Sequence, residues 1–302
     1  MQPYLWMLLG SFCFAWMGAA AHALREHCEW QVIALARSSL PLFFGTSLAV
    51  LGGARLAVLS PGILWVRSIA GSISLVCTFF ALTVLPPSHV FTLSSTFPIW
   101  VALLSWPLYR KRPTLQVWLS VFGSVLGVAL LEMSAPSENV DEDSLSRWLA
   151  VVSTLVAAFS TAVAMLGLNR LRHIHPWSIV AHFSGVALMF SLTAFLIGGS
   201  ASATALPPLP QIEAVWLLLA VGASATVGQL FLTKAFSSGP PAKISVISLT
   251  QVVFALLLDM LFWDRRFNAL TFAGMALVMA PTAWLMIAQT TTIKRDMAIE
   301  PE

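Results

Sequence analysis

The sequence of 302 residues contains few charged residues, because Asp, Glu, Lys and Arg together make up only 10% of it. Soluble globular proteins contain about 25% charged residues, so this chain has too little polar material to cover a surface that faces water. Hydrophobic residues make up 58% of the sequence. Apolar runs such as Val151 to Gly167 and Val215 to Leu232 approach or reach the roughly 20 residues that a helix needs to cross a bilayer.

The sequence also lacks the alternation of polar and apolar residues that a membrane β-barrel requires. In lipid, every backbone amide must find its hydrogen-bond partner within its own segment, so long apolar runs predict helices. We therefore predict an all-α membrane protein with ten transmembrane helices. The expected spans are 4–23, 31–52, 62–85, 88–108, 114–132, 148–168, 176–197, 214–235, 240–263 and 268–288.

Motifs for cofactor or nucleotide chemistry are missing as well. The three cysteines, Cys13, Cys28 and Cys77, neither pair evenly nor have the spacing of metal ligands. The sequence has no glycine-rich phosphate loop followed by Lys, no His-Glu-x-x-His and no serine in a nucleophile elbow. We expect no enzymatic activity, no ATP coupling, no cofactor and no metal, and the net charge of +3 is too small to indicate a nucleic-acid partner.

An internal duplication organises the chain. The stretch from Phe80 to Pro113 recurs, without a gap, 154 residues later. A shared pair of consecutive prolines with one register on both sides is not expected by coincidence. The matched pairs include Ala81 and Ala235, Pro86 and Pro240, Pro87 and Pro241, Thr96 and Thr250, and Arg112 and Arg266.

The two copies are expected to lie in opposite orientations. Each copy holds five spans, and because five is odd the second copy must enter the membrane from the opposite side. We predict two inverted five-helix repeats, residues 1–132 and 148–288, an acidic connecting loop, 133–147, and a cytoplasmic tail, 289–302. Inverted repeats are the architecture of alternating-access transporters.

The distribution of positive charge predicts that both termini are cytoplasmic, in a cell (inner) membrane. In that orientation most of the 16 Lys and Arg residues fall in cytoplasmic loops, which is the usual bias of membrane proteins. Arg265 and Arg266 argue against it, because they then lie outside. An alternative for Leu5 to Ala23 is a cleaved signal peptide, but no Lys or Arg precedes Leu5.

Two stretches resemble helices of EamA-type proteins in the drug/metabolite transporter superfamily. The residues from Val66 to Gly71 and from Phe80 to Pro86 are similar to the third helix of that family, and those from Gln229 to Ala235 to the eighth. The family has an acidic residue at the end of spans four and nine; Asp264 fills the second position, whereas Tyr109 and Arg110 replace the first. The resemblance implies ten helices, cytoplasmic termini and movement of small metabolites, often outward.

Four ionisable residues inside the predicted spans are functional candidates, because each costs at least about 2.5–3.5 kcal/mol in the bilayer. They are Arg37, Arg67, His182 and Asp259. Snorkelling to the headgroups is the alternative for the arginines, and a hydrogen bond to a neighbouring helix is the alternative for His182. Asp259 lies near the end of its span and is the candidate for proton coupling. One carboxylate cannot neutralise two arginines, so we expect an anionic group on the solute.

Polar and aromatic residues in the spans complete the predicted binding site. Gln229 must face other helices, because an unpaired amide in hydrocarbon is costly. The predicted site also includes Thr96, Thr250 and Gln251 in spans 4 and 9, where Pro98 interrupts span 4, and Trp16 and Trp100 as apolar walls.

We expect a secondary transporter, acting as an exporter, for small polar or amphipathic metabolites. Its partners would be the solute and the lipid bilayer. The alternatives are a non-transporting receptor or scaffold and a lipid-modifying membrane enzyme. Spans 5 and 10 are expected to be the outer helices, and Gly123, Gly127 and Gly274 would mark a homodimer seam there.

Overall fold

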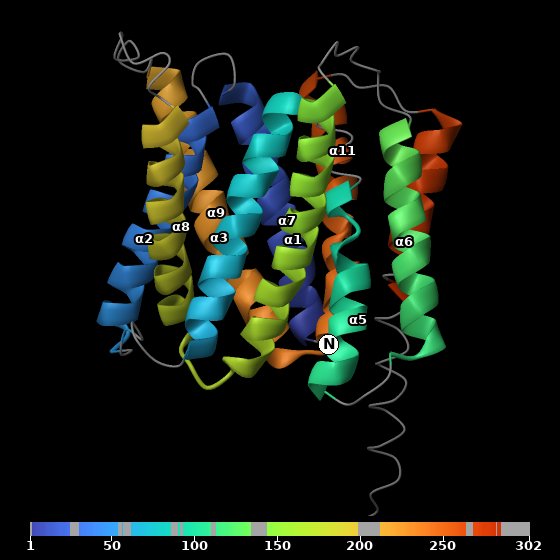
Figure 1. Ribbon diagram of the computed structural model, residues 1–302, viewed down its shortest axis with the longest axis horizontal. Helices are drawn as coiled ribbons and strands as arrows, with labels where there is room; N and C mark the ends of the chain where they lie inside the picture. The colour runs from blue at the N-terminus through green and yellow to red at the C-terminus, as the bar shows by residue number, and fades with distance from the viewer. Residues whose placement is uncertain are drawn as a thin grey trace, which may run out of the picture.

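The computed structural model describes residues 2–24, 30–53, 56, 62–85, 90, 93–109, 113–133, 144–198, 212–263, 268–281 and 283–284. Every regular element in these ranges is a helix, and the helices form a bundle (Figure 1). The helices are α1 (Gln2–Leu24), α2 (Trp30–Leu51), α3 (Gly62–Val84), α5 (Phe97–Tyr109), α6 (Leu115–Met133), α7 (Ser144–Arg170), α8 (Pro176–Gly198), α9 (Ile212–Ser238), α10 (Pro241–Ser248) and α11 (Thr250–Trp263). A last helix covers Ala269–Pro281.

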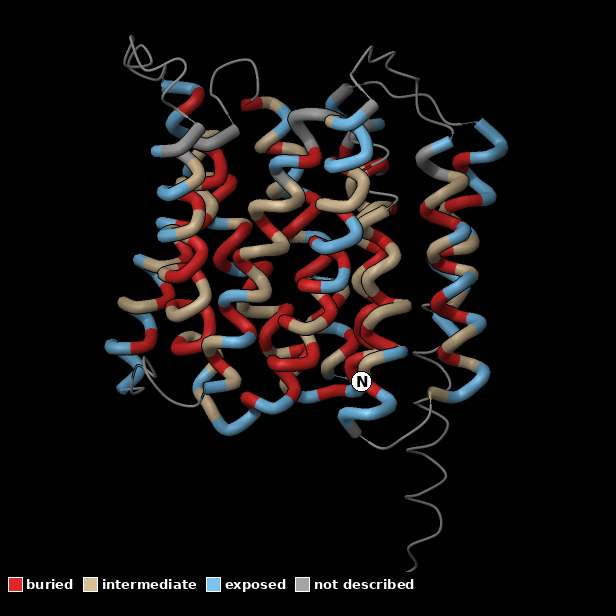
Figure 2. Tube along the Cα trace, in the orientation of Figure 1, coloured by how far each residue is buried: buried red, intermediate tan, exposed pale blue. Residues whose placement is uncertain are grey.

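These helices confirm the ten predicted spans. Within the described ranges, six helical stretches have the length and apolar composition to cross a membrane, and α10 and α11 together make one of them, Pro241–Phe262. The other four are shorter apolar helices, Gly62–Thr78, Phe97–Leu108, Leu115–Leu130 and Ala269–Pro281. Figure 2 shows exposed residues along the outside of the bundle, and many of them are large and apolar, such as Leu51, Met189 and Leu261. A surface of this kind suits lipid.

The two halves of the chain run in opposite directions. In Figure 1, α1 begins at the lower end, where the N-terminus is marked, whereas α7 begins at the upper end and runs downward. The packing repeats with the halves exchanged: α1 packs on α9, and α7 packs on α3 in the same way. Likewise α1 contacts α11, and α7 contacts α5. The fold is therefore that of two inverted five-helix repeats.

Glycines bring α2 close to both neighbours from the second repeat. A Cβ atom on Gly222 of α9 would lie 2.0 Å from Leu40 Cδ1 of α2. A Cβ atom on Gly45 of α2 would lie 3.2 Å from the backbone nitrogen of Ala181 in α8. Helix α2 thus lies close against α8 and α9, so polar groups on these three helices can come together.

The predicted outer helices do lie at the edge of the bundle, where α6 stands beside the last helix (Figure 1). The glycines expected to mark a homodimer seam there pack within the same chain, and the homodimer itself stays a prediction. A Cβ atom on Gly127 would lie 2.8 Å from the backbone oxygen of Gly274, and one on Gly123 would lie 3.6 Å from Pro281 Cγ. These close approaches join span 5 to span 10 within one molecule.

Spans 4 and 9 are both interrupted, and at matching positions. Turn residues Ser95 and Thr96 precede α5, and Leu249 separates α10 from α11. Pro98 does not cause the first interruption, because it lies in the first turn of α5, where a missing N–H is tolerated. Around each break, amides bond to the carbonyl three residues earlier, as in Thr96 to Leu93 and Leu249 to Val246, both 3.1 Å.

Candidate functional site

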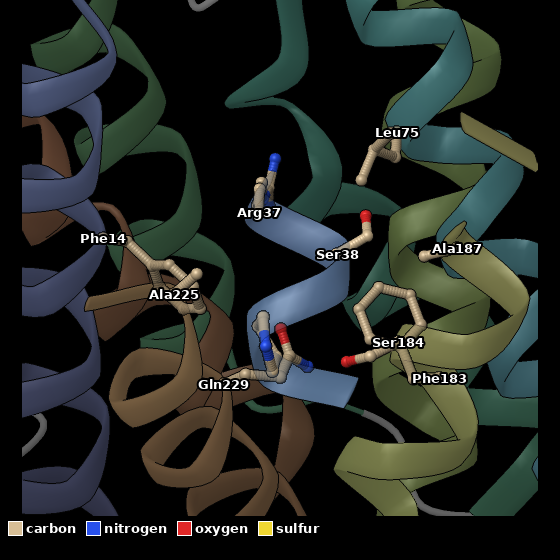
Figure 3. Close-up of a pocket in the computed structure, with 10 residues that line it drawn as sticks. Phe14, Arg37, Ser38, Leu75, Phe183, Ser184, Ala187, Ala225 and Gln229 are labelled. Atoms are coloured by element: carbon tan, nitrogen blue, oxygen red, sulfur yellow. The ribbon is translucent and has the colours of Figure 1, made fainter. Parts of the chain in front are cut away.

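A small cavity lies among α1, α2, α3, α8 and α9, and its enclosed space of about 10 Å³ holds about one water molecule. Three of these helices belong to the first repeat and two to the second, so the cavity lies between the repeats. Figure 3 shows side chains from all five helices around it. The polar residues that line it are Arg37, Ser38, Ser184 and Gln229. The apolar ones are Phe14, Pro41, Leu75, Phe183, Ala187 and Ala225.

The polar groups of the cavity are mostly buried. Ser38, Ser184 and Gln229 are each exposed by less than 9%, and in Figure 3 the hydroxyls of Ser38 and Ser184 point into the space between α2 and α8. The Ser38 hydroxyl has no hydrogen-bond partner among the residues that the structure describes. A buried polar group without a partner costs about 1–3 kcal/mol, and a solute or a water that enters the cavity can supply the missing bond.

The sequence around Arg37 explains why α2 can open a polar site. Pro41 lies inside α2 and has no N–H, so the carbonyl of Arg37, four residues earlier, loses its intrahelical hydrogen bond. Both residues line the cavity, and the Arg37 side chain is half-buried. One turn of helix therefore offers a guanidinium, a backbone carbonyl without a helical partner and the Ser38 hydroxyl.

Arg67 lies behind the cavity wall rather than on it. The side chain is 1% exposed, so it does not reach the molecular surface as a snorkelling arginine would. Its Cζ atom lies 3.8 Å from the ring centroid of Phe183, and Phe183 lines the cavity. Gly71 and Gly167 make room for it because they have no side chain. A Cβ atom on Gly71 would lie 3.1 Å from Arg67 Nη1, and one on Gly167 would lie 3.1 Å from Arg67 Cβ.

His182 is turned toward α3 and away from the cavity lining. Its Nδ1 atom lies 2.8 Å from the Ser68 hydroxyl, and its ring packs edge-on against Trp65 with centroids 4.7 Å apart. The hydrogen bond to a neighbouring helix, which the sequence left as the alternative, is thus present. The next two residues, Phe183 and Ser184, line the cavity instead.

The remaining predicted site residues lie around α5, α10 and α11, apart from the cavity lining. Trp16 packs edge-on against Phe262 of α11 with centroids 5.7 Å apart. Trp100 packs in the same manner against Phe159 of α7, at 5.5 Å.

The threonines at the two breaks are satisfied within their own spans, across the interruption. The hydroxyls of Thr96 and Thr250 donate to the carbonyls of Leu93 and Ile247. Gln251 is half-buried in α11. Asp259 lies on the same helix, but its side chain lies outside the described residues.

Of the ten predicted site residues, Arg37 and Gln229 line the cavity. Arg67 lies behind the Phe183 ring, which lines it. Sequence reasoning missed Ser38, Pro41, Phe183 and Ser184. A proline four residues after a charged residue within an apolar span was a usable signal for Pro41 and Ser38. Nothing in the pattern marked Phe183, because one phenylalanine among 19 carries no information on its own.

Among the described residues, no group of three His, Cys, Asp or Glu side chains could hold a metal ion.

Comparisons with known proteins agree with this architecture. A solved crystal structure superposes with a TM-score of 0.79 at 16% identity, covering 94% of this chain and 98% of that chain, which shows the shared fold. The pseudopaline exporter CntI of Pseudomonas aeruginosa (strain UCBPP-PA14) is 29% identical over 275 residues, which are 90% of this chain and 91% of the exporter. A transporter of Helicobacter pylori (strain J99) is 25% identical over 236 residues, 76% of this chain and 74% of that protein. The model of the EamA-like transporter family matches residues 1–133 and 148–287, and the chain belongs to this family.

Proposed function

We propose that the protein is a secondary transporter that exports a small polar or amphipathic metabolite by alternating access. The observation that carries this proposal is the polar cavity between the repeats, where Arg37, Ser38, Ser184 and Gln229 meet inside an otherwise apolar bundle. Polar groups in a membrane bundle are costly and mark solute pathways.

Inverted repeats supply the two states that alternating access needs. Because each half packs on the other through equivalent contacts, α1 with α9 and α7 with α3, exchanging the conformations of the halves gives an arrangement of similar energy. That arrangement opens the same cavity to the other side of the membrane. In this proposal the repeats, 1–132 and 148–288, move against each other around the cavity.

The direction and the driving force are part of the proposal. Export is supported by the relative that is named as a pseudopaline exporter. Because the sequence has no phosphate-binding loop, we propose that a gradient of protons or of a co-substrate drives transport. Asp259 is the candidate proton carrier. The bias of Lys and Arg supports an inner-membrane protein with both termini in the cytoplasm.

Metabolite pools test the transporter proposal directly. Intracellular small molecules are compared between cells that lack the protein and cells that overproduce it, and the solutes that differ are loaded into liposomes with the purified protein. We expect at least one solute to accumulate in the deletion cells and to leave the liposomes.

Gln229→Leu serves as the matched variant, because it removes the amide from the cavity while keeping a similar volume. It should slow efflux at least tenfold while the protein stays folded. Equal metabolite pools in both strains, together with liposomes that release nothing, would contradict the proposal and would favour a receptor or scaffold.

A further inference from the structure

Arg67 is a buried cation that leaves part of its hydrogen-bonding capacity unused. Its Nε and Nη1 atoms are both buried without a hydrogen-bond partner among the described residues, although the side chain is only 1% exposed. A buried guanidinium in an apolar bundle is normally compensated by an anion and by hydrogen bonds to its nitrogens. Here the guanidinium charge lies against the face of the Phe183 ring, whose centroid is 3.8 Å from Arg67 Cζ.

The aromatic ring is a weak substitute for an anion. A cation over an aromatic face gains about 0.5–2 kcal/mol, whereas hydrogen bonds between a guanidinium and a carboxylate or phosphate are about twice as strong as neutral ones and are often bidentate. The ring therefore stabilises the cation in this structure, but it cannot compete with an anionic group that reaches the same nitrogens.

Phe183 also separates Arg67 from the cavity. The ring lines the cavity, is half-buried and also contacts Arg67. It lies close to Gly71 of α3, where a Cβ atom would lie 2.8 Å from Phe183 Cε2, so the glycine leaves room for the ring. Figure 3 places Phe183 on α8 beside Ser184, across the cavity from Ser38.

We propose that the transported solute carries a carboxylate or phosphate group, and that Phe183 is the gate through which this group reaches Arg67. This inference rests on the proposed transport function and names the class of its substrate. In this structure the ring covers Arg67. When the solute enters, the ring rotates to another side-chain rotamer and the anionic group takes its place on the guanidinium.

The other polar groups have separate roles in this binding event. Arg37, half-buried on the cavity wall, attracts the anion into the cavity. The hydroxyl of Ser38, which has no partner among the described residues, and the Gln229 amide bind the rest of the solute. Release follows when the ring returns to Arg67, so the cation is never left without a neighbour.

The test uses full-length protein in liposomes and matched solutes that differ in charge. The liposomes contain a small-molecule extract of the cells that carry the protein, supplemented with succinate and succinamide, glutarate and glutaramide, and glucose 6-phosphate and glucose. Efflux of every solute is followed by mass spectrometry. We expect every exported solute to carry a carboxylate or a phosphate, and the neutral member of each supplemented pair to stay inside.

Two variants separate an anion site from a structural arginine. Arg67→Lys keeps the charge but not the planar fork, and should raise the half-saturation concentration of the exported anion at least tenfold. Phe183→Leu removes the ring that competes for the guanidinium, so the half-saturation concentration should fall several-fold. A merely structural ring would give the opposite change or none, and this variant keeps the test decisive if the Arg67 variant does not fold.

The outcomes distinguish this inference from the transport function itself. If the wild-type protein exports solutes that carry neither a carboxylate nor a phosphate, transport stands and the anion gate is wrong. If both variants keep the wild-type half-saturation concentration for an exported anion, the anion binds elsewhere and the role of Arg67 and Phe183 is wrong. If nothing leaves the liposomes with wild-type protein, the proposed function fails and this inference fails with it.

Discussion

Thr96 and Thr250 make the same hydrogen bond at matching positions of the two repeats. Each hydroxyl donates to the backbone carbonyl three residues earlier, Thr96 to Leu93 at 2.6 Å and Thr250 to Ile247 at 2.7 Å. In both spans the bond lies where the helix is interrupted. In both copies a threonine hydroxyl therefore donates to a backbone carbonyl that would accept from a backbone amide in a regular helix.

Removing one of these hydroxyls should destabilise the interrupted span. Thr250→Val keeps the shape of the side chain but leaves the Ile247 carbonyl without the hydroxyl donor in a buried place, since Thr250 is 0% exposed. We expect a loss of about 1–3 kcal/mol, measured as a lower unfolding midpoint in detergent. Thr193→Val is the control, because that exposed hydroxyl bonds within regular helix α8 and its loss should change little.

The proline in α2 should matter for transport more than for stability. Pro41→Ala restores the N–H that bonds to the Arg37 carbonyl, so it should straighten α2 and raise the unfolding midpoint or leave it unchanged. Efflux should nevertheless fall at least several-fold, because the cavity loses a free carbonyl and its present shape. Pro107→Ala is the control: it makes the same exchange within α5, away from the cavity lining. Unchanged efflux in the Pro41 variant would show that the missing N–H of Pro41 has no role.

The contact between α2 and α9 depends on a missing side chain. In Gly222→Ala the new Cβ atom would meet Leu40 Cδ1 at 2.0 Å and Leu40 Cβ at 2.5 Å, so the two helices must move apart. We expect a destabilisation of about 1–3 kcal/mol, as for other overpacked cores. Gly18→Ala in α1 is the matched control, because nothing lies within 4 Å of its added Cβ atom. Equal unfolding midpoints for the two variants would contradict the close packing.

The predicted orientation can be tested in the loop between the repeats. A cysteine in place of Ser137, in a protein without Cys13, Cys28 and Cys77, should react with a membrane-impermeant reagent in intact cells. The reason is that cytoplasmic termini place this loop outside after five spans. Reaction only after the cells are broken would reverse the orientation and exchange the two sides of the cavity.

The fold was predictable because its main signals are strong and local. Long apolar runs predicted the spans, and the shared pair of prolines at 86–87 and 240–241 predicted the repeat. The site was less predictable, because depth in a span does not tell which way a side chain points. Arg37 and His182 are both ionisable residues inside predicted spans, yet Arg37 lines the cavity and His182 bonds to Ser68. Trp16 and Phe183 are both aromatic residues within apolar spans, and only the packing shows that Phe183 covers a cation.

The central claim is that one cavity opens alternately to the two sides of the membrane. A cysteine in place of Ala187, which lines the cavity, tests it in the same thiol-free protein. An impermeant thiol reagent is added to right-side-out and to inverted membrane vesicles, with Ala157→Cys as the control, since Ala157 is 1% exposed and does not line the cavity. The account predicts that the cysteine at position 187 reacts from both sides while the control reacts from neither, whereas reaction from one side only, however long the exposure, would contradict alternating access.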